Sequence, residues 1–371
     1  MASALGRKVW WHLTEKTEPL FPNLLIFLVG RPVTGKSRAI DKAQIMMQHQ
    51  GGVRMAPDTI TRQWFFRRMA ESMISIDYPG QSLPSIQSPY SVVNSELGTL
   101  LTRDDTEFMR ALARLYDSPP TYMYETKHES GEHNDKDHIQ GPCLNVLGGV
   151  QPDWIKKCLP EEAFETGFPS RVIMVQSPIL QVPIIPLDEP DLGMVNDNDL
   201  AQNRLVKDLR SIGALRGRYT MTQDARRFLR DFAEGKLSRA PVHPKLETYN
   251  GRRWMHLAKL GMVVAASRSN GLVVSAGHMA QAEKWLNMAE ATMPHIMAMV
   301  GNNPLKPQMD LALGLIQRRW EQGKKSTPMH LVSQALYDEL HPAAWRFVIE
   351  ALVSSELVEE FMGNLKPVER T

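Results

Sequence analysis

The chain of 371 residues contains only two cysteines, Cys143 and Cys158, too few for a disulfide framework, and this fits a reducing compartment. No apolar run approaches the roughly 20 residues that a membrane span requires. The N-terminal stretch 1–16 lacks the apolar centre of a signal peptide. From these absences we expect a cytoplasmic protein that has no membrane partner.

The chain also lacks a strong charge of either sign, because its formal net charge is only +2. Any affinity for nucleic acid must therefore come from local basic patches. Hydrophobic residues make up 43% and charged residues 23% of the chain, which is ordinary for a globular protein. The length predicts two or three domains.

The strongest motif begins where an apolar run of strand length, Leu24–Val29, ends. Residues Gly30–Ser37 fit G-x-x-x-x-G-K-[ST], in which backbone N–H groups surround phosphate oxygens, Lys36 reaches the β- and γ-phosphates and Ser37 binds Mg²⁺. The motif predicts that the chain binds ATP with Mg²⁺. The residues expected to contact the nucleotide are Gly30, Arg31, Pro32, Val33, Thr34, Gly35, Lys36, Ser37 and Arg38.

A third predicted strand, Pro89–Glu96, ends in a carboxylate. Because the carboxyl ends of strands in an α/β sheet carry the chemistry, we predict that Glu96 orients the attacking water as a general base. Ser95 stands where many ATPases have an aspartate, and it can hold the metal only through its hydroxyl or a water. Asp104 and Asp105 are the alternative candidates for the base.

The fourth predicted strand, Cys143–Gly149, offers Asn145, or Gln151 just beyond it, as a sensor of the γ-phosphate. A hydrogen-bonded amide at the strand end is an equal alternative for either residue. Arg171 precedes the fifth predicted strand, Val172–Val175. There it could act catalytically on the nucleotide of a neighbouring subunit, or pair within the chain with Glu161, Glu162 or Glu165.

Residues 122–141 are predicted to form a protruding hairpin between strands. His128, His133, His138 and Cys143 also suggest a zinc site, but their spacing matches no compact finger pattern. Acidic residues interleave with Lys127 and Lys136, so DNA contact by this hairpin stays open.

Several further motifs follow the glycine-rich loop in order along the chain. They are Ala56-Pro57-Asp58, Ser95-Glu96-Leu97, Leu147–Pro152, Gly167–Arg171, Tyr249-x-x-Arg252 and Lys259-Leu260. With them, residues 20–300 resemble a phage and prophage family of P-loop ATPases associated with replication genes. Ser170-Arg171 is similar to the arginine-finger box of AAA+ proteins.

This resemblance implies an AAA+-like, ring-forming homo-oligomer, with a hexamer as one candidate size, in a bacterial or phage-infected cytoplasm. It also implies a helical lid, in which Arg252, Arg253 or Lys259 is the candidate for a second cation at the nucleotide; Arg252 is the residue we select. A solvent-facing role is an equal alternative for each of them.

The stretch Gly301–Pro304 marks a boundary, and three helical patterns followed by the strand Leu357–Phe361 have the outline of a winged helix. We therefore predict an α/β P-loop core with a parallel sheet over 23–190 after an extension over 1–22, a lid over 191–303 and a winged helix over 304–371. The predicted function is ATP hydrolysis coupled to work on DNA. The alternative is a slow, nucleotide-switched DNA-binding or adaptor protein, which Ser95 favours. A small-molecule kinase is disfavoured because the lid and winged helix would have no task.

Overall fold

The computed structural model describes residues 1–32, 34–102, 105–126, 135–159, 161–176, 192–298, 306–323, 325–336, 345–354 and 357–368. The chain divides into two compact units between Gly301 and Asn302, close to the boundary expected at Gly301–Pro304. Each unit has its own hydrophobic core. Among the described residues, no helix is both long and apolar enough to cross a membrane.

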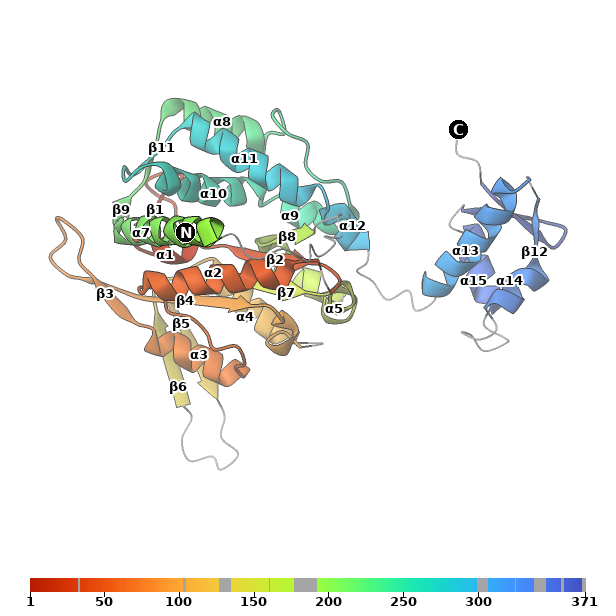
Figure 1. The fold of residues 1–371 in the computed structure, drawn as a ribbon, viewed down its shortest axis with the longest axis horizontal. Coiled ribbons are helices and arrows are strands. Elements are labelled where there is room, and N and C mark those ends of the chain that lie inside the picture. Colours follow the sequence, from red (N-terminus) through yellow and green to blue (C-terminus); the bar gives the residue numbers. More distant parts are fainter. Residues whose placement is uncertain are drawn as a thin grey trace. The chain divides into compact units, whose positions relative to one another are not determined.

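The larger unit is a mixed α/β structure around a mostly parallel five-stranded sheet, in the order β3–β4–β7–β2–β8 (Figure 1). Its strands are β2 (Leu25–Val29), β3 (Ile74–Ile76), β4 (Ser85–Asn94), β7 (Pro142–Val150) and β8 (Val172–Gln176). Strands β4, β7, β2 and β8 run parallel, and β3 pairs antiparallel with the start of β4. The carboxyl ends of the parallel strands therefore meet at one edge of the sheet.

The short stretch Val53–Ala56 joins the sheet only through a single bridge, between Met55 and Ser91 of β4. Ala56 donates to the carbonyl of Ser91, and Ser91 donates to that of Arg54. Pro57 follows at once and has no N–H to continue the ladder, so the pairing ends there.

Both faces of the sheet are covered, as the uninterrupted apolar strands require. On β2, Leu25 and Phe27 belong to one core, whereas Ile26 and the preceding residue Leu24 pack in the other. The first face packs against α3 (Arg62–Glu71), α4 (Thr106–Tyr116), α5 (Pro152–Cys158) and α6 (Glu161–Glu165). Thr61 caps α3 by accepting from Trp64 N–H.

The other face carries most of the helices that the sequence assigned to a separate lid. They are α7 (Leu192–Ala214), α8 (Gln223–Ala233), α10 (Arg253–Arg268) and α11 (Ala276–Glu290), with α1 (Ala2–Leu5) and α2 (Lys36–Gln50) on the same side (Figure 1). The remaining two, α9 (Glu247–Asn250) and α12 (Met293–Ala298), contribute buried residues to the first core. Residues 192–298 lie in one compact unit with the sheet. The stretch Leu257–Ala266 of α10 is buried throughout, because an all-round apolar helix needs cover on every side.

Short strand pairs tie the N-terminal residues into this layer. Strand β1 (Val9–Trp10) pairs with β9 (Gly217–Arg218), and β10 (Thr220–Met221) pairs with β11 (Val273–Val274). The predicted extension 1–22 is thus part of the larger unit.

The predicted hairpin consists of β5 (Thr121–Thr126) and β6 (Asp135–Gln140), paired antiparallel. His128 and His133 of the zinc alternative lie outside the described residues. Cys143 is fully buried at the start of β7, and burial raises the pKa of its thiol to about 11. A thiol that stays protonated is a poor zinc ligand. Among the described residues, no cluster of three or more His, Cys, Asp or Glu could hold a metal.

The smaller unit contains α13 (Lys306–Glu321), β12 (Thr327–Pro328), α14 (Met329–Ala335), α15 (Trp345–Ser354), β13 (Val358–Phe361) and β14 (Asn364–Pro367). Its antiparallel sheet has the order β12–β14–β13. Its core joins all three helices to this sheet through Ile316, Val332, Val348, Leu352 and Leu365. The third helical pattern of the sequence spans 342–355, and its residues 342–344 and 355 lie outside the described residues.

Candidate functional site

The glycine-rich loop leaves the carboxyl end of β2 and leads into α2. Gly30 N–H donates to the carbonyl of Val150 on β7 (3.1 Å), and Gly35 caps α2 with a φ of 81°, a left-handed conformation that favours glycine. A Cβ on Gly30 would lie 2.6 Å from Thr34 Oγ1, and that hydroxyl donates to the carbonyl of Arg31. Both glycines are therefore required by the folded loop. Val33 lies outside the described residues.

A cavity of about 600 Å³ opens beside this loop. Its charged lining residues are Lys36, Arg38 and Lys42, all from the first two turns of α2, and the described part of its lining contains no carboxylate. None of the three cations makes an ion pair with a residue that the structure describes. Together with the positive end of α2, they form a site suited to a large anion.

Ser95 and Glu96 follow β4 at the same edge, because β4 ends level with Gly148 of β7. Strand β7 lies between β4 and β2, so Glu96 is about 10 Å across the sheet from the glycine-rich loop, at ~5 Å per strand. Glu96 is exposed, and its carboxylate makes no ion pair with any described residue. Its position suits a base that acts on a water above the loop.

Two glycines of β7 allow the segment Ser95–Leu97 to approach this closely. A Cβ on Gly149 would lie 2.3 Å from the backbone oxygen of Ser95, and one on Gly148 would lie 2.6 Å from Leu97 Cδ2. The sequence shows the glycine pair at the strand end but not the segment that crosses it.

Sequence reasoning missed Asn94, which fixes the turn before Glu96. Its Oδ1 accepts from Glu96 N–H (2.7 Å), and its Nδ2 donates to the carbonyl of Asp58 (2.6 Å). Asp58 is exposed and accepts from Gln44 of α2. The sequence offered one signal for this contact. Pro57-Asp58 directly follows the stretch that bridges to β4 at Met55, so it lies at the same edge of the sheet as the end of β4.

Gln176 was also missed. It is the last residue of β8 and pairs in register with Val29, directly before the loop. Its Oε1 is buried and has no hydrogen-bond partner among the described residues. Gln151 follows β7 at the same edge and is half-buried. These two amides, rather than Asn145, lie beside the glycine-rich loop.

Asn145 lies near the opposite edge of the sheet. Its Oδ1 accepts from Leu24 N–H (3.0 Å), and five residues of β7, about 16 Å of strand, separate it from Val150 beside the loop. It is the hydrogen-bonded amide of the two alternatives, and the prediction that it senses a γ-phosphate is wrong.

Arg171 also lies at the amino edge, and its side chain is only 10% exposed. It donates to both carboxylate oxygens of Asp117 (3.0 and 2.6 Å) and to the carbonyl of Gly167 (2.7 Å). Gly167 has a φ of 68°, and a Cβ there would lie 2.7 Å from Arg171 Nη1. The Gly167–Arg171 motif therefore builds a partly buried ion pair, and Arg171 is not free to reach a neighbouring subunit.

Arg252 joins the same pair, with 3.7 Å between its Nη1 and Asp117 Oδ1. Arg253 is buried against Glu290, with a shortest contact of 2.6 Å. Neither arginine is among the residues that line the cavity beside the loop. The prediction of Arg252 as a nucleotide contact is corrected accordingly.

Lys259, the third candidate cation of the lid, lies on α10 and is buried against the residues just before β2. Its Nζ donates to Asn23 Oδ1 (2.8 Å) and lies 3.6 Å from the ring centroid of Tyr116. No carboxylate neutralises it at hydrogen-bond distance among the described residues, and burial lowers the pKa of Lys259 to about 7. Lys259 thus joins the two layers and does not contact the nucleotide site.

This burial predicts a pH-dependent stability. The unfolded lysine binds its proton up to a pKa of about 10.4, whereas the folded one releases it near pH 7, so the stability of the larger unit should rise between these values by up to about 1.4 kcal/mol per pH unit. Urea unfolding near pH 7 and near pH 9 measures this. Lys259→Met should flatten the rise, whereas Lys16→Met, at an exposed surface residue, should keep it. An equal rise in the Lys259→Met variant would contradict the assignment.

The alternative bases differ from Glu96. Asp105 caps α4 by accepting from Phe108 N–H (3.1 Å) and pairs with Arg62 (3.2 Å). Asp104 lies outside the described residues. Asp105 thus has a structural role that Glu96 lacks.

For Mg²⁺, the edge offers the exposed hydroxyl of Ser37 and the half-buried Ser95. Mg²⁺ is usually held by few protein oxygens together with phosphates and water, so this sparse donor set fits such an ion only when a polyphosphate supplies the remaining ligands.

A scan of protein-family models finds no family that matches this chain, and a search of curated proteins finds no match either.

Proposed function

We propose that this protein binds ATP at the cavity beside α2 and hydrolyses it, and that the larger unit is a P-loop ATPase core. The observation that carries the proposal is the arrangement of Lys36, Arg38 and Lys42 around a cavity at the start of α2, with no carboxylate among the described lining residues. The cavity volume of about 600 Å³ lies within the range of ligand pockets.

The strand order supports the P-loop assignment. With the bridge at Met55 counted as the edge pairing, the parallel strands run in the spatial order five, one, four, three, two. The glycine-rich loop follows strand one, which lies between strands five and four. An open parallel sheet binds ligands at the carboxyl ends of its strands, and here Gly30, Glu96 and Gln151 lie at those ends.

The residues divide the work by their positions. Lys36 neutralises the β- and γ-phosphates, and the N–H groups of the loop bind their oxygens. Glu96 accepts a proton from the attacking water. The turn that Asn94 fixes holds Glu96 in position. Mg²⁺, when bound through Ser37, neutralises charge on the phosphates.

DNA is the proposed partner, through the smaller unit. Its order of helix, strand, two helices and hairpin is that of a winged helix, whose third helix, here α15, commonly enters a DNA groove. Arg346 on α15 is exposed and stacks on Trp345, with 5.7 Å between guanidinium and ring. Glu350 on the same helix is also exposed, which keeps a protein partner as an alternative occupant.

Two experiments test this function. ATP hydrolysis is measured with and without DNA: turnover that rises with DNA supports a DNA-coupled ATPase, whereas slow turnover that DNA leaves unchanged supports the nucleotide switch that Ser95 favours. The mass of the complex with a non-hydrolysable ATP analogue tests the proposed ring-shaped homo-oligomer. A mass equal to that of a single chain in the presence of the analogue, with and without DNA, would reject the ring.

Deleting residues 304–371 should leave basal ATP hydrolysis largely intact, because the proposed nucleotide site lies wholly in the larger unit and the smaller unit has its own core. The deletion should weaken binding to duplex DNA, measured at a stated salt concentration because phosphate contacts depend on salt. Unchanged duplex affinity would reject the smaller unit as the duplex contact.

A further inference from the structure

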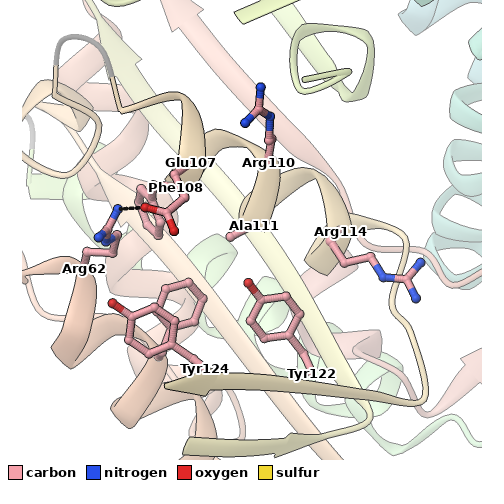
Figure 2. A pocket seen from close by; sticks show the side chains of 9 residues that line it. Arg62, Glu107, Phe108, Arg110, Ala111, Arg114, Tyr122 and Tyr124 are labelled. Atoms are coloured by element: carbon pink, nitrogen blue, oxygen red, sulfur yellow. Dashed lines mark hydrogen bonds and ion pairs between the residues drawn. The ribbon is translucent and has the colours of Figure 1, made fainter. Parts of the chain in front are cut away.

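A second pocket, of about 270 Å³, lies on the face of the sheet opposite α2, where α3, α4 and the hairpin strand β5 meet (Figure 2). Its floor is aromatic and its rim is basic. The lining includes Phe66, Tyr122 and Tyr124 together with Arg62, Arg110 and Arg114. None of these residues has a role in the nucleotide site.

The aromatic floor is rigid. Phe66 is 1% exposed and stacks on both tyrosines, with centroids 5.6 Å from Tyr122 and 4.0 Å from Tyr124 and interplanar angles of 13° and 22°. Both tyrosines are half-buried, and their hydroxyl ends point toward α4 (Figure 2). The pocket thus presents two oriented rings that need no ordering when a ligand binds.

Two of the three arginines on the rim carry positive charge that no described acid neutralises. Arg62 is neutralised by Asp105 and Glu107, at 3.2 and 3.0 Å. Arg110 and Arg114 are exposed, lie one turn apart on α4, and make no ion pair with any described residue. Arg114 extends past the side of Tyr122, and Arg110 projects from α4 away from the rings (Figure 2).

We propose that this pocket binds single-stranded nucleic acid, with one base against the tyrosines and the adjoining phosphates on Arg110 and Arg114. The inference deepens the proposed action on DNA and rests on it. Sequence-tolerant recognition of single strands combines aromatic platforms with a basic track, and both are present here. A base in a duplex is stacked on both faces and cannot enter such a pocket without being flipped out, so the pocket selects single strands.

The protein-side test compares two arginine pairs of equal spacing. Arg110→Ala with Arg114→Ala should weaken binding of the full chain to a fluorescent oligothymidylate at least about tenfold. It should also lower the salt slope of binding by about 1.4, at ~0.7 per phosphate contact of a single strand. Arg226→Ala with Arg230→Ala removes the same charge from an exposed turn of α8 and should leave the affinity within about twofold. Equal losses in the two double variants would reduce the effect to net charge and overturn the proposal.

The ligand-side test needs no variant that could unfold. An abasic oligomer of the same length should bind the wild-type chain at least about fivefold more weakly than oligothymidylate, because stacking contributes ~1–3 kcal/mol per base. Equal binding of the two oligomers would show a phosphate surface without a base pocket and would overturn the proposal.

Failure of the pocket and failure of the ATPase proposal are distinguishable. Lys36→Ala should retain single-strand binding in the absence of nucleotide, since Lys36 does not line this pocket. ATP binding by the Arg110→Ala, Arg114→Ala double variant should equal that of the wild type. Loss of single-strand binding in Lys36→Ala would place the nucleic acid at the nucleotide cavity and reject the pocket.

Discussion

Replacing Lys36 by alanine is expected to abolish effective ATP binding, because the dissociation constant should rise at least about 100-fold above that of the wild type. Lys36 is the cation closest in sequence to the left-handed Gly35 turn, and no described acid competes for it. Hydrogen bonds to charged groups contribute about 1.5–3 kcal/mol each, and 2.7 kcal/mol corresponds to the expected factor. Titration calorimetry with ATP in the presence of Mg²⁺ measures it.

The matched control for this experiment is Lys42→Ala. Lys42 lines the same cavity but lies six residues further along α2, outside the glycine-rich loop. Its loss should weaken binding by no more than about tenfold, because an exposed charge at longer range is screened by solvent. Native affinity in Lys36→Ala, with an unchanged melting temperature, would refute the assignment of the loop as the nucleotide site.

The parts of this fold that the sequence predicted are those that local patterns specify. The uninterrupted apolar runs at Leu24–Val29 and Val172–Val175 are typical of parallel strands covered on both faces, and both are strands. The glycine-rich loop is specified by residues that are adjacent in the chain. The mixed α/β class with a mostly parallel sheet followed from these segments and is confirmed.

The errors concern the end of the parallel strands at which a residue lies. No local sequence pattern specifies this position. Asn145 and Gln151 are six residues apart in sequence, yet the pairing of β7 with β2 puts the first near the amino edge and the second at the carboxyl edge. Arg171 was predicted to pair with glutamates on the helix before it or to act on another subunit. Its partner, Asp117, is 54 residues away and is brought to it by the end of α4.

The lid over 191–303 was implied by the resemblance, which does not say where its helices pack in this chain. The burial of Lys259 against Asn23 and Tyr116 requires α10 to lie on the sheet, because a buried ammonium needs fixed acceptors. These acceptors come from segments more than 100 residues earlier in the chain, so sequence spacing could not reveal them.

Replacing Glu96 by glutamine is expected to leave ATP affinity within about twofold and to lower the rate of hydrolysis by about 10² or more, the scale on which a general base acts. Glutamine keeps the size of the side chain and its hydrogen-bonding ends but cannot accept the proton of the attacking water. The backbone of Glu96 is held by Asn94 Oδ1 on one side and by Thr99, which donates to the Glu96 carbonyl, on the other. The substitution should therefore change the chemistry and not the turn.

The comparison variant is Asp58→Asn, because Asp58 is the other exposed carboxylate attached to this turn, through Asn94 Nδ2 and its own carbonyl. That hydrogen bond uses the backbone of Asp58, so the substitution preserves it and removes only the charge. Single-turnover hydrolysis at saturating ATP separates the two residues, since it reports the chemical step without product release. The opposite result would be a wild-type rate of hydrolysis in Glu96→Gln and a rate two orders of magnitude lower in Asp58→Asn. The base would then be Asp58, which lies beside α2, and not the residue that follows β4.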